Sequence, residues 1–175
     1  MAEETLDPIG AILDETLDRE GWPTYTEHPQ DRGGPTKGGI TLRTLDSWRG
    51  RRCTRKELER LQKREAIEIL RRRYIDVQGI HKLSALDLQA QVVDSAIHSG
   101  PVLAVKDLQR AIGVTPDGII GPITFKKVIE LGDEESSKLL AVERTIRLAR
   151  IVAKDSSQLV WLVGWVTRSL SFIKR

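Results

Sequence analysis

The residues with the clearest potential for acid–base chemistry lie between positions 20 and 41. Glu20 ends a run of apolar residues at helical spacing, and a second carboxylate, Asp31, and a hydroxyl, Thr36, follow in a glycine-rich stretch. This layout can place two acids on opposite walls of a cleft. Glycosidases need such an arrangement, because one acid protonates the departing oxygen while the other assists water or the developing cation. Glu20, Asp31 and Thr36 are therefore candidate catalytic residues, although Asp31 and Thr36 could equally cap backbone amides in turns.

The same segment offers side chains that could contact a substrate. Trp22, Tyr25 and Thr41 are the candidates for this role. A catalytic acid that works near neutral pH needs a raised pKa, and partial burial beside Trp22 or Tyr25 would supply the desolvation that raises it. Glu27 is a reserve second carboxylate, whereas His28 is expected to be a turn residue rather than a catalytic one.

The elements that must position these residues are expected to be mainly helical. Apolar residues at helical spacing after Pro8 predict a helix over residues 8–19 that ends at Glu20. Eight glycines and prolines in residues 21–41 exclude a helix there and predict a structured loop or small hairpin. Later helices are expected over residues 54–75, where a capping box begins one broken or two successive helices, and over 83–99, 101–112, 122–131, 134–154 and 157–173. The fold class is therefore mainly α with a small glycine-rich β-hairpin or loop element.

The composition excludes several functional classes. One cysteine among 175 residues removes any intramolecular disulfide framework and any multi-cysteine metal site, and three scattered histidines do not replace it. We therefore expect no metal and no cofactor. The most apolar segment, residues 159–166, is too short to span a membrane, so we expect a buried helix there. Trp161 and Trp165 are expected to pack in the core, and stacking on a sugar is the alternative. An acidic N-terminus without a following apolar stretch predicts synthesis in the cytoplasm without a signal peptide.

Charge is distributed unevenly along the chain. The overall excess is only +3, yet residues 1–31 carry nine acidic and one basic residue, residues 43–74 twelve basic and five acidic, and residues 138–175 eight basic and two acidic. The basic regions could face a polyanion, either nucleic acid, acidic phospholipid or bacterial cell wall, or could simply solvate helix faces. We expect no nucleic-acid partner, because the chain has no recognised docking motif. The absence of heptad repeats predicts a monomer.

Several stretches, in a shared order, resemble one known family. Residues 20–41 contain Glu20-Gly21-Trp22, Tyr25, His28-Pro29, Asp31, Gly33-Gly34, Thr36 and Gly39-Ile40-Thr41. This pattern resembles that of glycoside hydrolase family 108, which includes phage endolysins acting as N-acetylmuramidases. Tyr74 and residues 108–114, 117–122 and 164–168 are similar to the type 3 peptidoglycan-binding region associated with that family. The resemblance covers nearly the whole chain.

The resemblance implies a lysozyme-like helical fold. A catalytic muramidase region is expected over residues 1–98 and a peptidoglycan-binding region over residues 99–175, packed as one globular unit. The family implies that Glu20 is the general acid and that Asp31 and Thr36 hold a water against the far face of the sugar. Two departures bear on this assignment: Trp22 replaces the second glycine of the pattern, and two additional residues lengthen the step from Glu20 to Asp31.

The expected activity is hydrolysis of the β-1,4 bond between N-acetylmuramic acid and N-acetylglucosamine in peptidoglycan. A lytic transglycosylase, which forms a 1,6-anhydro product without water, and a non-catalytic wall-binding protein are the alternatives. The expected setting is a phage endolysin that reaches the cell wall through a holin, without stable insertion into the membrane. A muramidase that remodels the wall for a bacterial secretion system is the alternative setting.

Overall fold

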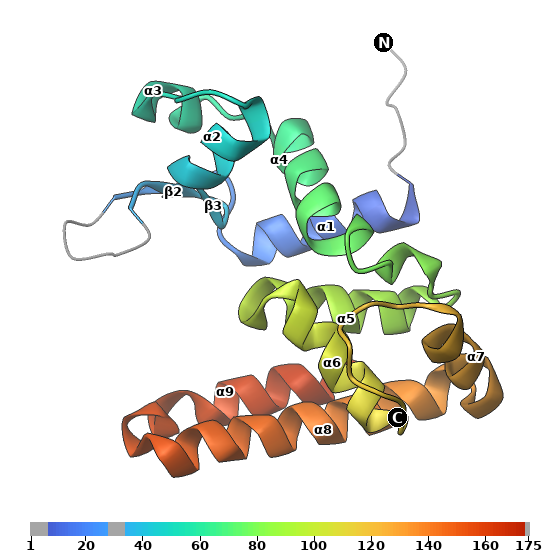
Figure 1. The fold of residues 1–175 in the computed structure, drawn as a ribbon. Helices are drawn as coiled ribbons and strands as arrows, with labels where there is room; N and C mark the ends of the chain where they lie inside the picture. The colour runs from blue at the N-terminus through green and yellow to red at the C-terminus, as the bar shows by residue number, and fades with distance from the viewer. Residues whose placement is uncertain (1–6, 28–33, 174–175) are drawn as a thin grey trace. The chain divides into compact units, whose positions relative to one another are not determined.

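The computed structural model describes residues 7–27 and 34–173. Within these ranges the chain is mainly helical, with nine α-helices and one small three-stranded antiparallel sheet (Figure 1), which confirms the expected fold class. The chain divides into two compact units, residues 1–73 and residues 74–175. A division by function near residue 98 stays a prediction.

The first unit contains four of these helices and all three strands. In chain order they are α1 (Pro8–Arg19), β1 (Tyr25–Thr26), β2 (Thr36–Lys37), β3 (Ile40–Thr41), α2 (Leu42–Arg49), α3 (Arg55–Glu59) and α4 (Lys63–Leu70). The strands pair in the order β1-β2-β3, so the glycine-rich segment forms the small sheet that its turn residues predict. Figure 1 shows α2 directly after the sheet, and α1 packs beside α4.

Helix α1 begins where the sequence predicts. The Asp7 carboxylate accepts a hydrogen bond from the Gly10 amide at 2.7 Å, and Pro8 occupies the first helical position, where its missing amide proton costs nothing. Leu13 and Leu17 are fully buried. One face of the helix therefore belongs to the core of the first unit, and its C-terminal end is held in a fixed position.

Ion pairs tie α4 to its neighbours in the first unit. The Lys63 ammonium lies 2.8 Å from the Asp14 carboxylate and 2.7 Å from that of Asp18, both on α1. Arg49 of α2 binds Glu65 of α4 through two parallel hydrogen bonds of 2.9 and 2.8 Å. This paired geometry is the strongest form of an arginine–carboxylate contact. Helices α1, α2 and α4 are thereby linked on the polar side as well as through their apolar faces.

Helix α2 was not among the predicted helices. The Thr41 hydroxyl accepts a hydrogen bond from the Thr44 amide at 3.1 Å and begins the helix, and Gly50 ends it with φ of +64°. Eight residues are too few for apolar periodicity to stand out, so caps rather than pattern mark this element. The capping box predicted at Thr54 is present, with Glu57 as its acidic partner.

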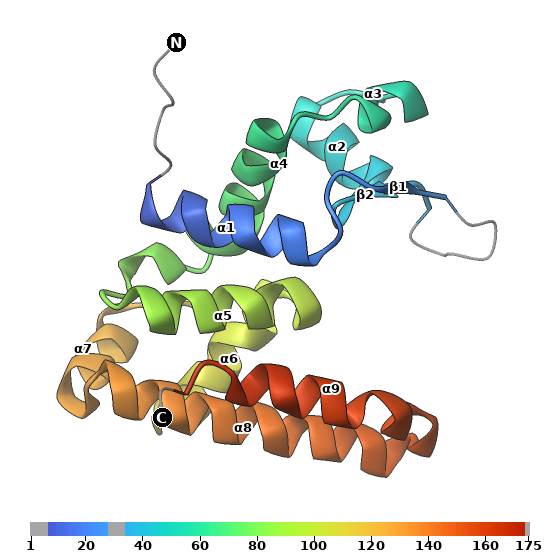
Figure 2. The ribbon, with the colours of Figure 1, turned by 180° about the vertical axis from the view of Figure 1, so that it is seen from behind.

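The second unit is a helical assembly. A π-helical segment, η1 (Arg71–Asp76), leads into it, and its further elements are η2 (Ile80–Lys82), α5 (Leu86–Ser99), α6 (Pro101–Ala111), α7 (Pro122–Leu131), α8 (Asp133–Lys154), η3 (Ser156–Gln158) and α9 (Leu159–Leu170). Figures 1 and 2 show α9 running back along α8, while α5 and α6 pack together and against α8. The predicted helices of this half are all present, with ends that differ by a few residues.

A buried glutamine organises the turn before α7. The two amide protons of Gln109 are shared among three acceptors, the Asp117 carboxylate at 2.7 Å, the Ile119 carbonyl at 3.0 Å and the Thr124 hydroxyl at 3.1 Å. The amide oxygen accepts from the Gly118 amide at 2.8 Å. A buried amide must satisfy its donors and acceptor in this way. Gln109, Asp117 and Gly118 belong to the stretches that resemble a peptidoglycan-binding region, and these contacts give them a role in the fold.

Helix α9 is largely exposed, so the expectation of a buried helix there is wrong. Val160, Trp161 and Val163 are 74%, 59% and 77% exposed, whereas Trp165 is half-buried. Helix α9 packs mainly on α8, and an apolar helix with one main neighbour cannot bury its whole surface. In the part of the chain that the structure describes, no helix is long and apolar enough to cross a membrane.

Candidate active site

Glu20 occupies the C-cap position of α1. Gly21 follows with φ of +80°, and its amide donates to the Asp18 carbonyl at 3.1 Å, while the Trp22 amide donates to the Leu17 carbonyl at 3.0 Å. These two bonds define a Schellman motif, in which a glycine in the left-handed conformation ends a helix. The sequence Glu-Gly-Trp thus determines that α1 ends at Glu20. The Glu20 side chain is half-buried.

The Trp22 side chain packs against the turn that joins β2 to β3. Gly38, in this turn, has φ of +53°, and a Cβ atom there would lie 2.5 Å from Cε3 of Trp22 and 3.2 Å from Cδ2 of Leu17. The indole therefore lies against bare backbone, which only glycine provides. This contact accommodates the tryptophan that stands in place of the second glycine of the family pattern.

The Lys37 ammonium lies over the Trp22 ring, with Nζ 4.8 Å from the ring centre. The side chain is buried, and Nζ donates hydrogen bonds to the carbonyls of Glu59, at 2.5 Å, and Leu61, at 3.0 Å. Burying an ammonium is costly unless its protons find acceptors, and two carbonyls and an aromatic face supply them here. Lys37 thereby joins the hairpin to the segment after α1, to the end of α3 and to the connection between α3 and α4.

Thr36 stands between two other threonines in the sheet. It is paired with Thr26 of β1 on one side and with Thr41 of β3 on the other. Residues opposite each other in antiparallel strands share one face, so the three threonines form a row. Lys37 and Ile40 belong to the alternate face and are buried. The row of threonines is therefore on the face turned away from that packed side.

The hydroxyls of Thr36 and Thr41 differ in their hydrogen bonding. Thr36 Oγ1 donates its proton to the Gly34 carbonyl at 3.0 Å, so its lone pairs remain able to accept a hydrogen bond. Thr41 Oγ1 accepts from the Thr44 amide at 3.1 Å and lies 3.0 Å from the Thr44 hydroxyl. Capping of α2 therefore engages Thr41, and its role in binding substrate stays a prediction.

Tyr25 and Glu27 form a polar pair connected to α3. The Tyr25 hydroxyl donates to Glu27 Oε2 at 2.8 Å, and Arg55 Nε donates to Glu27 Oε1 at 2.8 Å. Desolvation raises the pKa of the Tyr25 hydroxyl, and its hydrogen bond to the Glu27 carboxylate raises it further. Glu27, the reserve second carboxylate, is thus held by donors from two elements.

The predicted site residues are only partly brought together by the structure. Asp31, the predicted second catalytic carboxylate, and His28 lie outside the described residues. Sequence reasoning missed Lys37 and Gly38, which hold Trp22 in place. A signal for Lys37 was present, because strand alternation places it on the face opposite Thr36.

Two family models match consecutive parts of the chain. Residues 13–100 match the family model described as glycosyl hydrolase 108, and residues 103–170 match the one described as predicted peptidoglycan domain. The solved structure of Brucella abortus SagA is similar, with a TM-score of 0.72 and 31% sequence identity, and the alignment covers 95% of this chain and 96% of that one. No curated protein matches the chain.

Proposed function

Because this chain belongs to the glycosyl hydrolase 108 family, we propose that it is an N-acetylmuramidase with Glu20 as its general acid. It would hydrolyse the β-1,4 bond between N-acetylmuramic acid and N-acetylglucosamine. Family membership confirms the resemblance found in the sequence, and a glycosyl hydrolase domain implies a glycosidase. The peptidoglycan domain over residues 103–170 supports peptidoglycan as the substrate.

The observation that carries the proposal is the position of Glu20 at the end of α1. Its backbone is fixed by the Schellman motif, and Trp22, two residues later, is locked by Gly38 and Lys37. A general acid must stay within hydrogen-bond reach of the oxygen it protonates, so a fixed attachment point is what this role requires.

In the proposed reaction, the Glu20 carboxyl gives its proton to the glycosidic oxygen as the bond from that oxygen to the muramic acid C1 breaks. Water then attacks the oxocarbenium-like carbon and gives up its own proton. Thr36 Oγ1, whose proton is engaged by Gly34, can accept a hydrogen bond from this water. Asp31 is proposed to complete the water site and to accept the proton.

The test of the proposal is the substitution Glu20→Gln, which keeps the shape of the side chain and removes the acid. Peptidoglycan turnover is expected to fall by about 10²- to 10⁴-fold while sedimentation with peptidoglycan is retained. Glu15→Gln is the matched control, because Glu15 lies on the same helix, is exposed and pairs with Arg19 at 2.5 Å. Unchanged turnover in Glu20→Gln would refute the assignment, and no turnover by the parent protein would indicate a non-catalytic binder.

Mass spectrometry of the digest identifies the reaction. Hydrolysis leaves reducing N-acetylmuramic acid ends, whereas a lytic transglycosylase leaves 1,6-anhydro ends and a glucosaminidase leaves reducing N-acetylglucosamine ends. We expect reducing muramic acid ends only. Either of the other products overturns the muramidase proposal while leaving the family unchanged.

We further propose that the protein acts on the cell wall as a phage endolysin released through a holin. The peptidoglycan domain supports action at the wall. Induction of the protein in a bacterium with and without a co-expressed holin tests this setting. Lysis is expected only with the holin, and wall damage without a pore former would contradict holin-dependent release.

A further inference from the structure

The second unit contains a cavity of about 520 Å³ formed by residues of α5, α6, α8 and α9. This volume is in the range of pockets that hold small ligands. Arg144 and Arg147 of α8 and Arg168 of α9 line it, together with Trp165 and apolar side chains. The lining includes solvent-exposed positions such as Gly164, so a ligand can reach the charged side chains from solution.

Two buried aspartates hold these arginines without lining the cavity themselves. Asp94 of α5 lies 2.9 Å from Arg144 and 2.8 Å from Arg168, and Asp107 of α6 lies 2.6 Å from Arg147. Both aspartates are at most 2% exposed. The aspartates thus orient each guanidinium before any ligand binds. The arginines line the cavity, whereas the carboxylates that hold them do not.

Among the ion pairs of the described residues, this cluster contains more guanidinium groups than carboxylates. Four guanidinium groups share the two carboxylates, because Arg110 also binds Asp107, at 3.1 Å. Burial lowers the pKa of Arg144, and repulsion from Arg147 and Arg168 contributes to the lowering. The Arg144 side chain is only 6% exposed, and its Nε has no hydrogen-bond acceptor among the described residues. An anion in the cavity would offset the repulsion and supply acceptors.

Open space adjoins Gly164 in the wall of this cavity. It lies inside α9 and lines the cavity, yet a Cβ atom there would meet no other atom within 4 Å. A glycine inside a helix weakens the helix, and close packing does not require one at this position. The space beside Gly164 is therefore open.

We propose that this cavity binds a free carboxylate of a peptidoglycan peptide stem. The inference rests on the proposed peptidoglycan substrate, and it assigns peptide recognition rather than glycan recognition to the second unit. Peptide stems carry free carboxylates, which arginine binds through paired N–H donors. Trp165 and the apolar wall suit the aliphatic part of a short peptide.

The probe for this proposal is a preparation of peptide stems released from peptidoglycan by an amidase. Because stems contain no glycosidic bond, calorimetric titration into the full chain measures binding independently of hydrolysis. We expect the stems to bind, and stems whose carboxylates have been converted to amides to bind about tenfold more weakly or less. Equal affinity for both preparations, or no binding of either, overturns the proposal.

A matched pair of substitutions separates ligand binding from a structural role of the ion pairs. Arg147→Gln and Arg110→Gln each remove one arginine from Asp107, but only Arg147 lines the cavity. We expect Arg147→Gln to weaken stem binding about tenfold and Arg110→Gln by less than about twofold. Equal effects of the two substitutions would show that the arginines only stabilise the fold and would overturn the proposal.

A second pair keeps the test valid if Arg147→Gln does not fold. Gly164→Leu narrows the cavity without touching the ion pairs, and Gly164→Ala is its control for helix stability. Stem binding is expected to be lost in the leucine variant and kept in the alanine variant; binding by both overturns the proposal. Peptidoglycan hydrolysis without stem binding would refute this cavity's role alone, and stem binding without hydrolysis would refute the muramidase proposal alone.

Discussion

Lys37 Nζ lies 4.8 Å from the centre of the Trp22 ring, and this contact joins the hairpin to the segment that follows Glu20. The same nitrogen donates to the carbonyls of Glu59, the last residue of α3, and of Leu61, in the connection to α4. A single buried cation therefore connects three parts of the first unit. Its removal should affect both the stability of the unit and the position of the proposed acid.

Lys37→Met is expected to lower the free energy of unfolding by about 2 kcal/mol, since it removes two charge-assisted hydrogen bonds and the cation–π contact. Lys37→Arg, which keeps the charge, is the conservative comparison. Urea unfolding measures stability, and peptidoglycan turnover under folding conditions measures the effect on Glu20. A methionine variant with parental stability and turnover would show that the contact is incidental.

Gly38→Ala is expected to displace Trp22, because the added Cβ atom would lie 2.5 Å from the indole. The left-handed backbone costs about 1 kcal/mol for alanine, and the clash should add about 1–3 kcal/mol. Gly39→Ala is the matched control: its φ is +77°, but nothing lies within 4 Å of the new atom. The free energy of unfolding and peptidoglycan turnover should both fall further in Gly38→Ala than in Gly39→Ala. Equal losses in the two variants would argue against a packed Trp22.

Thr36→Ala should reduce turnover by about tenfold or more, since it removes the oxygen proposed to accept a hydrogen bond from the attacking water. Thr36→Ser keeps the hydroxyl and is expected to retain most of the activity. A water attacking from the far face inverts the anomeric configuration, so proton NMR should detect the inverted product first. Initial formation of the retained anomer would exclude the proposed water site.

Acid should destabilise the first unit through Glu57. The Arg51 guanidinium, at 2.5 Å, and the Thr54 amide and hydroxyl lower the pKa of Glu57 from 4.5 to about 2. The unfolded chain then binds this proton more tightly, so the stabilisation is complete above pH 4.5 and is lost as the pH falls towards 2. The urea midpoint of the parent should decline over this window, and that of Glu57→Gln should decline less. The control is Glu68→Gln, because the Glu68 carboxylate of the parent lies 4.0 Å from Arg64. This variant should show the same dependence of the urea midpoint on pH as the parent. The same pH dependence in all three proteins would refute the assignment.

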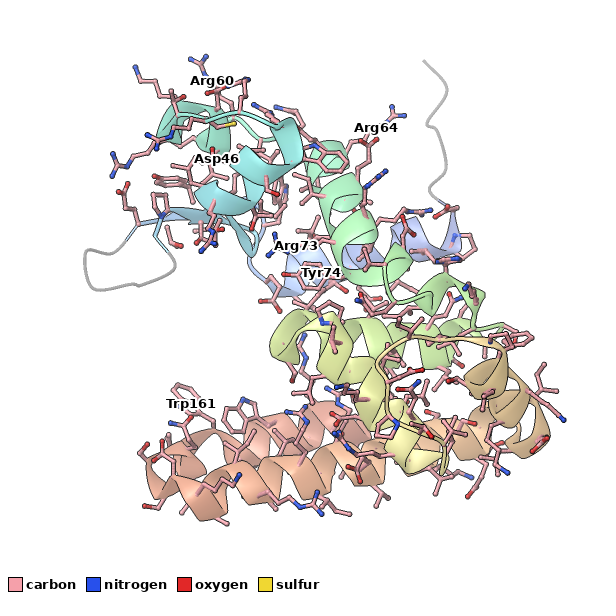
Figure 3. The ribbon with its side chains drawn as sticks, in the orientation of Figure 1. Asp46, Arg60, Arg64, Arg73, Tyr74 and Trp161 are labelled. Carbon is pink, nitrogen blue, oxygen red and sulfur yellow. The ribbon has the colours of Figure 1, made fainter. Side chains whose placement is uncertain are left out.

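Trp161→Ala should weaken sedimentation with peptidoglycan and change the free energy of unfolding by less than about 0.5 kcal/mol. The side chain is 59% exposed, and Figure 3 shows it extending outward from α9. An exposed tryptophan in a peptidoglycan domain suits contact with a ligand rather than packing. Val160→Ala, on the same helix and 74% exposed, is the control. Binding that is equally reduced by both substitutions would indicate a general loss of apolar surface.

Much of the local structure could be predicted from the sequence, because it depends on neighbouring residues. Pro8 and Gly21 mark the ends of α1, and Thr54 with Glu57 marks the start of α3, as the structure confirms. The mainly helical fold and the family were likewise recognisable from spacing and ordered motifs. Helix α2 escaped prediction because its eight residues depend on caps rather than on a long apolar pattern.

By itself the sequence determined which residue types end α1, which segments become helices, and that a carboxylate stands at position 20. Only the tertiary structure decided which distant residues meet: Lys37 with carbonyls more than twenty positions away, and arginines of α8 and α9 around one cavity. It also decided that Trp161 is exposed rather than buried. The physical reason is that periodicity reveals an apolar or polar face, whereas burial and partnership depend on which other element packs against that face.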